Sequence, residues 1–92
     1  MKITCDPIKR MKTIKDRGLD FMDASVIFNG EVHRFQDTRK DYGETRMIAV
    51  GYLDGRMVLV GYVQRGMTRH IFSMRKANER EIKKYQEQFE KS

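Results

Sequence analysis

Basic side chains dominate the second half of the 92-residue chain, and their type points to phosphate chemistry. The stretch between Gly55 and Asn78 contains no acidic residue and five cationic ones: Arg56, Arg65, Arg69, Arg75 and Lys76. Arginine suits a phosphate because its planar guanidinium donates two hydrogen bonds to one anion and stays charged over the usable pH range. The alternative, ordinary solvated charges on exposed strands, stays open for this group.

Glu81 has two possible roles. Asn78 lies three residues before it, which is the spacing of a capping box at the start of a helix. A carboxylate at this helix start, near Arg75 and Arg80, could instead act as a general base toward a ribose 2′-hydroxyl. The neighbouring arginines would lower its pKa and make it a weak base that relies on its position.

The other reactive side chains form no recognisable catalytic pattern. His33 and His70 are 37 positions apart on expected strands, where a packed or half-exposed structural histidine is the favoured interpretation. One cysteine, Cys5, and two distant histidines supply no ligand cluster for zinc. The sequence has neither a Gly-rich nucleotide loop nor a Ser-His-Asp order, so we expect no metal ion and no cofactor.

The charge balance favours an anionic partner. The chain carries 19 basic and 13 acidic side chains, a net charge of +6 and an isoelectric point near 9.7. Nucleic acid, an acidic protein and an anionic membrane surface all fit that sign. The sequence has no run of about 18 apolar residues, no signal-peptide pattern and no internal disulfide, so we expect a cytoplasmic protein that does not contact a membrane. The length suits one domain over residues 1–92.

Helix signals are strong near the N-terminus. Asp6 is a candidate N-cap followed by proline, and Gly18 is a natural C-terminal cap, which predicts a helix over residues 8–17. A second short helix is expected over residues 21–28. Residues 3–5 form a possible short edge strand before the first helix.

Alternating apolar residues predict strands in the middle of the chain, at residues 31–36, 46–52, 57–64 and 68–74. Asp54-Gly55 is a strong hairpin signal between two of these strands. The C-terminal helix, residues 78–90, is predicted from apolar side chains at helical spacing: Ile82, Tyr85 and Phe89. The expected fold is α+β, with two N-terminal helices, a three- or four-stranded antiparallel meander and a C-terminal helix packed on the sheet.

Arg65 and Arg75 end successive strands of that meander. In an antiparallel pair that turns at Gly66, Arg65 lies by the turn and Arg75 at the far end. The two converge only if the sheet twists strongly or if another strand brings a basic residue beside Arg75. Arg46, at the start of its strand, is the candidate for that role.

Three groups of motifs follow one another along the chain. The first is CDPIK (residues 5–9), GLDF (18–21) and ASVIF (24–28). The second is GETR (43–46), with Gly51 six residues beyond Thr45. The third is Arg65, IFSMRKAN (71–78), Glu81 and Tyr85. In this order, and with these gaps, the set resembles the BrnT family of toxins over nearly the whole chain.

That resemblance implies a fold similar to RelE and a toxin of a type II toxin–antitoxin pair that cleaves RNA without a metal. Its partner would be a BrnA-like antitoxin, a ribbon-helix-helix DNA-binding protein through which alone the pair contacts operator DNA. Arg65 and Arg75 fall on family arginines and Glu81 on the family glutamate, so these three are the expected catalytic residues. The residues expected to hold the RNA backbone are Lys9, Arg46, Arg69 and Arg80. The chain departs from the family at Arg17, where relatives carry a histidine.

The expected reaction is attack of a ribose 2′-hydroxyl on the adjacent phosphate, which leaves a cyclic phosphate and excludes DNA as a substrate. Arg65 and Arg75 would stabilise the charge that builds on the phosphate oxygens, while Glu81 would orient or deprotonate the hydroxyl. A rival hypothesis is a non-catalytic module that uses the same basic sheet to bind nucleic acid or protein.

Overall fold

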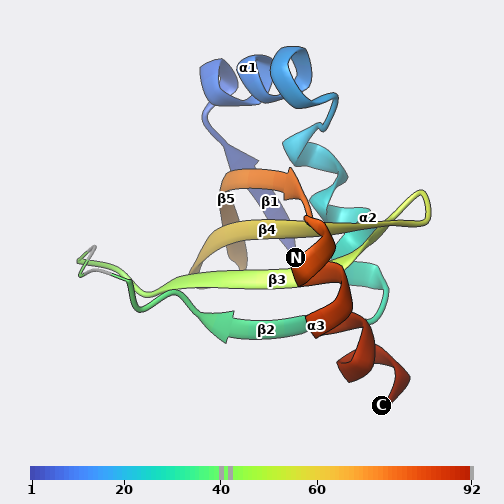
Figure 1. The fold of residues 1–92 in the computed structure, drawn as a ribbon. Helices are drawn as coiled ribbons and strands as arrows, with labels where there is room; N and C mark the ends of the chain where they lie inside the picture. The colour runs from blue at the N-terminus through green and yellow to red at the C-terminus, as the bar shows by residue number, and fades with distance from the viewer. Residues whose placement is uncertain (40, 42, 92) are drawn as a thin grey trace.

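The centre of the molecule is a five-stranded sheet in the order β1-β5-β4-β3-β2, with helices on both faces (Figure 1). The computed structural model describes residues 1–39, 41 and 43–91. The strands are β1 (Lys2–Cys5), β2 (His33–Gln36), β3 (Arg46–Leu53), β4 (Arg56–Arg65) and β5 (Thr68–Lys76). The helices are α1 (Pro7–Arg17), the short 3₁₀ helix η1 (Phe21–Asp23), α2 (Ala24–Asn29) and α3 (Glu79–Glu90). The predicted α+β class is confirmed.

The expected antiparallel meander is present with four strands, but the sheet that contains it has a fifth strand and is mixed, because the possible edge strand at residues 3–5 joins it as β1. β1 runs parallel to β5, with Lys2 opposite Thr68. Only β2 to β5 form an antiparallel meander. A four-residue strand carries no pairing signal of its own, and here the packing of Ile3 and Cys5 against the core fixes its place at the sheet edge.

Capping residues set the ends of the first helix. The Asp6 carboxylate accepts a hydrogen bond from the Ile8 N–H at 2.8 Å. Gly18 ends the helix in the left-handed conformation, with φ of 67°, and donates its N–H to the Ile14 carbonyl. The predicted helix is confirmed and begins one residue earlier, at the proline.

The second predicted helix is divided into η1 and α2. The Asp20 carboxylate accepts the Met22 N–H at 3.0 Å and so starts a tight 3₁₀ turn. The α-helix then begins only at Ala24. Because a 3₁₀ turn and an α-helix bury apolar residues at similar spacing, sequence periodicity alone does not separate them.

Turn residues organise the meander. Asp54 and Gly55 both have positive φ, 52° and 77°, as a tight two-residue hairpin requires, so this predicted turn is confirmed. Pairing between β4 and β5 shifts between Gly61 and Tyr62, because Phe72 is an extra residue in β5. This bulge turns the Phe72 ring to the same side of the sheet as its neighbour Ser73.

Each face of the sheet carries its own core. The larger core lies on the side of α2 and η1 and contains Leu19, Phe21, Ala24, Ile27, Ala49, Val58, Val60, Tyr62, Ile71 and Met74. The smaller core lies under α3 and contains Val50, Met57, Leu59 and Tyr85. No helix among the described residues is long and apolar enough to cross a bilayer.

The C-terminal helix packs on the sheet, as predicted, but it covers only part of one face. It crosses β3 and β4 near the β3–β4 hairpin, and the strands extend beyond it toward the β2–β3 loop (Figure 1). Its buried partners, Val50, Met57 and Leu59, belong to that end of the sheet, and Tyr85 of the helix also stacks on Phe35 of β2. The other end of the same face is therefore available for side chains that do chemistry.

Candidate active site

The uncovered part of the α3 side of the sheet gathers polar side chains and one aromatic ring from five segments, and we call it the open face. Its residues are Thr4, Glu44, Arg46, Arg65, His70 and Phe72. Register explains the gathering, since Arg46 and His70 are both paired with Val63 of β4, one from each side. Arg65 is two positions beyond Val63, so its side chain points to the same face.

The strongest contact on the open face joins Arg65 to Glu44 of the β2–β3 loop. The Arg65 guanidinium donates two hydrogen bonds to the carboxylate, at 2.9 and 2.8 Å. These bonds lower the pKa of Glu44, and the positive charges of His70 and Arg46 lower it further. Both side chains of the pair are about half exposed, at 51% and 49%, so water competes for the contact.

An aromatic ring supports the second arginine of the open face. The Arg46 guanidinium carbon lies 4.4 Å from the centre of the Phe72 ring, within cation–π distance. The bulge in β5 puts that ring over Gly61, where an added Cβ would come within 2.7 Å of it. A residue without a side chain at this position therefore lets the ring come close to the sheet beneath Arg46.

His70 is oriented by the edge strand. Its Nδ1 lies 3.0 Å from the Thr4 hydroxyl oxygen of β1. Among the described residues, no hydrogen bond is formed by the other ring nitrogen, Nε2. The half-buried ring is compatible with the packed or half-exposed structural histidine favoured from the sequence, but it also lies on the same face as three charged side chains, Glu44, Arg46 and Arg65.

Arg65 and Arg75 do not converge. Arg65 pairs with Thr68 beside the β4–β5 turn, whereas Arg75 pairs with Leu59. Leu59 and Arg65 are six positions apart on β4, which corresponds to about 20 Å along the strand. Arg46 lies at the Arg65 end and not beside Arg75. The two arginines therefore cannot hold the same phosphate group in this conformation.

Arg75 is bound to Glu81 at the start of α3. Two hydrogen bonds of 2.7 Å join the guanidinium to both carboxylate oxygens. Glu81 also accepts the Asn78 N–H at 3.0 Å, while its own N–H donates to the Asn78 side chain, so the predicted capping box is confirmed. The bonds from Arg75 are the main reason that the pKa of Glu81 falls to about 2. A carboxylate held by three donors is a poor base.

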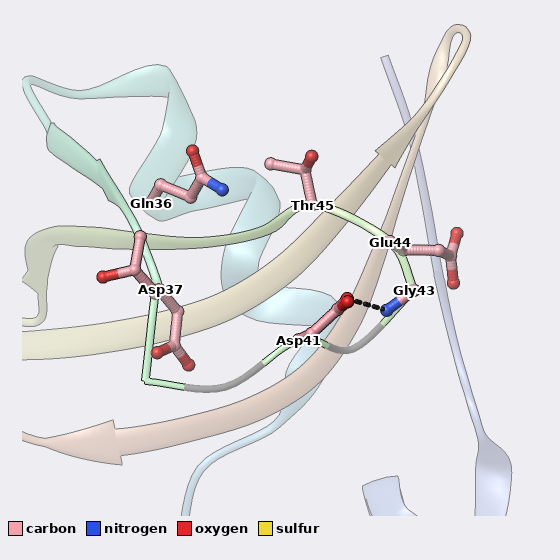
Figure 2. A pocket seen from close by; sticks show the side chains of 7 residues that line it. Gln36, Asp37, Asp41, Gly43, Glu44 and Thr45 are labelled. Atoms are coloured by element: carbon pink, nitrogen blue, oxygen red, sulfur yellow. Dashed lines mark hydrogen bonds between the residues drawn. The ribbon is translucent and has the colours of Figure 1, made fainter.

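Two cavities lie near these charged pairs, one beside Arg75 and Glu81 and the other in the loop that carries Glu44. A cleft of about 400 Å³ lies beside the Arg75–Glu81 pair, and its lining includes Phe35, Gly61 and Ser73. A second hollow, of about 460 Å³, lies within the β2–β3 loop and is lined mainly by polar and acidic residues (Figure 2). Figure 2 shows the Glu44 side chain pointing away from Asp37 and Asp41, which fits its contact with Arg65 on the sheet.

The remaining predicted RNA-binding residues are scattered. Arg69 lies on the opposite face of the sheet, with its guanidinium carbon 4.2 Å from the centre of the Phe28 ring, and burial there lowers its pKa. Arg80 is exposed in the first turn of α3. Lys9 is exposed on α1 and lines a small cavity that reaches Phe72. Arg46 is thus the one predicted backbone contact on the open face.

Two titratable residues of the open face, Glu44 and His70, are not among the site residues predicted from the sequence. Glu44 is separated from Arg65 by 21 positions and His70 from Thr4 by 66, so neither contact leaves a local pattern. The position of Glu44 two residues before Arg46 was the available signal for Glu44. Residues at the start of a strand lie at one end of the sheet, so the two side chains are expected near each other. Within the described part of the chain, no three acidic, histidine or cysteine side chains are grouped so as to hold a metal ion.

Residues 6–81 match the model of a family described as the ribonuclease toxin BrnT of type II toxin–antitoxin systems. The chain belongs to the BrnT family. It is therefore a ribonuclease toxin with an RNA target and an antitoxin partner. No curated protein matches the chain. The matched region contains all of the open face except Thr4, which lies before it.

We expect acid to lower the free energy of unfolding of this BrnT chain by protonating Glu81. The folded pKa of about 2 lies below the ordinary 4.5, so the contribution of Glu81 is complete above pH 4.5 and is lost as the pH falls toward 2. Glu81→Gln keeps a capping side chain but loses the charge, and should cost roughly 1 kcal/mol at neutral pH because water screens the partly exposed Arg75. Urea unfolding at several pH values measures both effects. Glu79→Gln, in the same turn, is the matched control, and equal acid sensitivity of the two variants would contradict the assignment.

Proposed function

We propose that this BrnT chain cleaves single-stranded RNA without a metal ion, by attack of a ribose 2′-hydroxyl on the adjacent phosphate. The observation that carries the proposal is that two arginines, Arg46 and Arg65, lie at one end of a sheet face, in the part that α3 leaves uncovered. Cleavage adds negative charge to the phosphate oxygens, and guanidinium groups fixed nearby stabilise that charge without a metal. An open sheet face accepts an extended strand, which suits RNA that is not in a duplex.

The predicted catalytic arginines take different phosphates in this proposal. Arg65 acts on the phosphate that is cleaved. Arg75, about 20 Å away along the strand direction, binds another phosphate of the same RNA. Lys9 and Arg80 remain predicted contacts to the RNA backbone. Arg69 faces the other side of the sheet, so it contacts RNA only if the strand passes over the sheet edge.

Glu81 as the general base also remains a prediction. Its three hydrogen bonds and low pKa favour the structural role. The Glu81→Gln variant described above separates the roles, because a base would be lost and a cap would be kept. We expect cleavage within about threefold of wild type, whereas a loss of 100-fold or more would establish the base.

The proposed partner is a BrnA-like antitoxin of the ribbon-helix-helix type, which alone contacts operator DNA. A net charge of +6 suits a partner with an acidic segment. The resemblance to RelE in fold belongs to the same proposal, since a C-terminal helix lies on an antiparallel meander here.

Removal of metal is the direct test of the reaction. Purified protein incubated with single-stranded RNA in excess chelator should cleave at a rate within about twofold of the rate in magnesium. The products should end in a 2′,3′-cyclic phosphate and a 5′-hydroxyl, and the same sequence with a single 2′-deoxy substitution should resist cleavage at that position. Salt-sensitive binding that leaves the RNA intact would favour the non-catalytic module instead.

A further inference from the structure

Charge stabilisation by arginine leaves two protons unassigned. The attacking 2′-hydroxyl must lose one, and the departing 5′-oxygen must gain one. The open face holds two side chains that can take up or release a proton, Glu44 and His70, and the proposed roles of the arginines do not involve either of them. Glu44 is close enough to His70 for an electrostatic interaction between them, and both lie beside Arg46 and Arg65.

We infer that Glu44 is the general base and His70 the general acid of RNA cleavage, on opposite sides of a phosphate held by Arg46 and Arg65. This inference rests on the proposed function and adds to it the two residues that move protons. Neither is among the residues selected from the sequence. The geometry that carries it is the row Arg46, Val63, His70 across three strands, with Glu44 fixed to Arg65 next to that row.

Glu44 is released from its arginine partner more easily than Glu81 is. Both carboxylates accept two hydrogen bonds from an arginine. Glu81, however, is also fixed by the helix cap and is 20% exposed, whereas Glu44 is 49% exposed and belongs to a loop. An RNA phosphate competes for the Arg65 guanidinium, because both anions fit the same two donors. Once Arg65 turns to phosphate, Glu44 loses the bonds that lower its pKa and becomes a stronger base.

His70 is arranged to donate from Nε2. When the ring is protonated, Nδ1–H donates to the Thr4 hydroxyl oxygen at 3.0 Å, which fixes the ring plane and leaves Nε2–H for the leaving oxygen. Charged side chains from each packed segment share this face with the ring: Glu44 of the loop, Arg46 of β3, Arg65 of β4 and Lys2 of β1.

The step balances without a cofactor. The 2′-oxygen forms a bond to phosphorus while the bond from phosphorus to the 5′-oxygen breaks. The proton of the 2′-hydroxyl goes to the Glu44 carboxylate, and the Nε2 proton of His70 goes to the 5′-oxygen. The products are a 2′,3′-cyclic phosphate and a 5′-hydroxyl, with Glu44 protonated and His70 neutral, ready to be reset by solvent.

A sulfur substitution in the substrate tests the acid. In a dinucleotide whose 5′-bridging oxygen is replaced by sulfur, the leaving thiolate departs without a proton. His70→Gln should lower kcat on the all-oxygen substrate about 100- to 1,000-fold, yet should cleave the sulfur substrate within about fivefold of wild type. The high-pH fall of the wild-type pH–rate profile should also disappear in His70→Gln. A merely structural role for His70 would slow both substrates equally.

The base and the control complete the experiment. Glu44→Gln should slow both substrates about 100-fold, because loss of the base is not compensated by a better leaving group, and its low-pH fall should disappear. His33→Gln changes the other histidine, which packs on Phe89 under α3, and should keep the wild-type pH profile. If wild type cleaves RNA in chelator and His70→Gln is equally slow on both substrates, or not slow at all, this inference is wrong while the proposed function stands. If wild type does not cleave RNA, both are wrong.

Discussion

Arg65→Ala is expected to lower kcat for RNA cleavage about 100- to 1,000-fold, the usual effect of removing one fixed donor to a transition-state oxyanion. The loss falls on kcat because the charge on the phosphate oxygens peaks in the transition state and not in bound RNA. Arg65 is exposed and its contact is with a loop carboxylate, so the fold should be retained. Single-turnover cleavage of a defined RNA in chelator measures the effect, and circular dichroism confirms folding.

Two other arginines make the comparison specific. Arg75→Ala removes a charge about 20 Å away along the strands and should raise KM by about tenfold while kcat changes little. Arg56, at the β3–β4 hairpin, is exposed at the far end of β4, and Arg56→Ala should cleave like wild type. Equal losses of kcat in Arg65→Ala and Arg75→Ala would contradict the separation of their roles and would require a conformation that brings the two together.

Phe21→Ala should lower the free energy of unfolding by about 3 to 5 kcal/mol, the usual range for a fully buried Phe. Phe21 is 1% exposed and lies in the larger core, among side chains from η1, α2 and the sheet. Its removal leaves a cavity at the junction of these elements, which cannot close because η1 is fixed by the Asp20 cap. A chain of this length has a total stability of about 5 to 14 kcal/mol, so the variant should be close to unfolding at 37 °C.

Urea unfolding followed by far-ultraviolet circular dichroism measures this loss, since the chain has no tryptophan whose fluorescence could be used. The neighbouring Met22 is 39% exposed, and Met22→Ala should change stability by less than about 1 kcal/mol. A Phe21→Ala variant as stable as Met22→Ala would show that the larger core does not depend on η1.

Local elements were predicted well because their signals act over a few residues. The Asp6 cap, the Gly18 cap and the Asp54-Gly55 turn each fix the backbone through contacts within four positions. The capping box at Asn78 and Glu81 is of the same kind. The family could be recognised for a related reason, because ordered motifs survive as a pattern along the chain.

Local signals of this kind do not determine how strands pair across the sheet. The direction of β1 and the bulge at Phe72 depend on which apolar surfaces pack together, and packing is a property of the whole fold. The division of residues 21–29 into η1 and α2 depends on a hydrogen bond that the Asp20 carboxylate accepts from the Met22 N–H. These features decide which face of the sheet each charged residue occupies.

The proposal assigns the phosphate chemistry to the open face, with Arg46 rather than Arg75 beside Arg65. By itself the sequence determined an excess of positive charge, the helix and hairpin ends, the α+β class and membership of a ribonuclease toxin family. Only the tertiary structure decided that Arg65 and Arg75 lie at opposite ends of β4 and β5, and that Arg65 meets Glu44 beside Arg46 and His70. The physical reason is that strand register, not distance along the chain, determines which side chains share one end of a sheet.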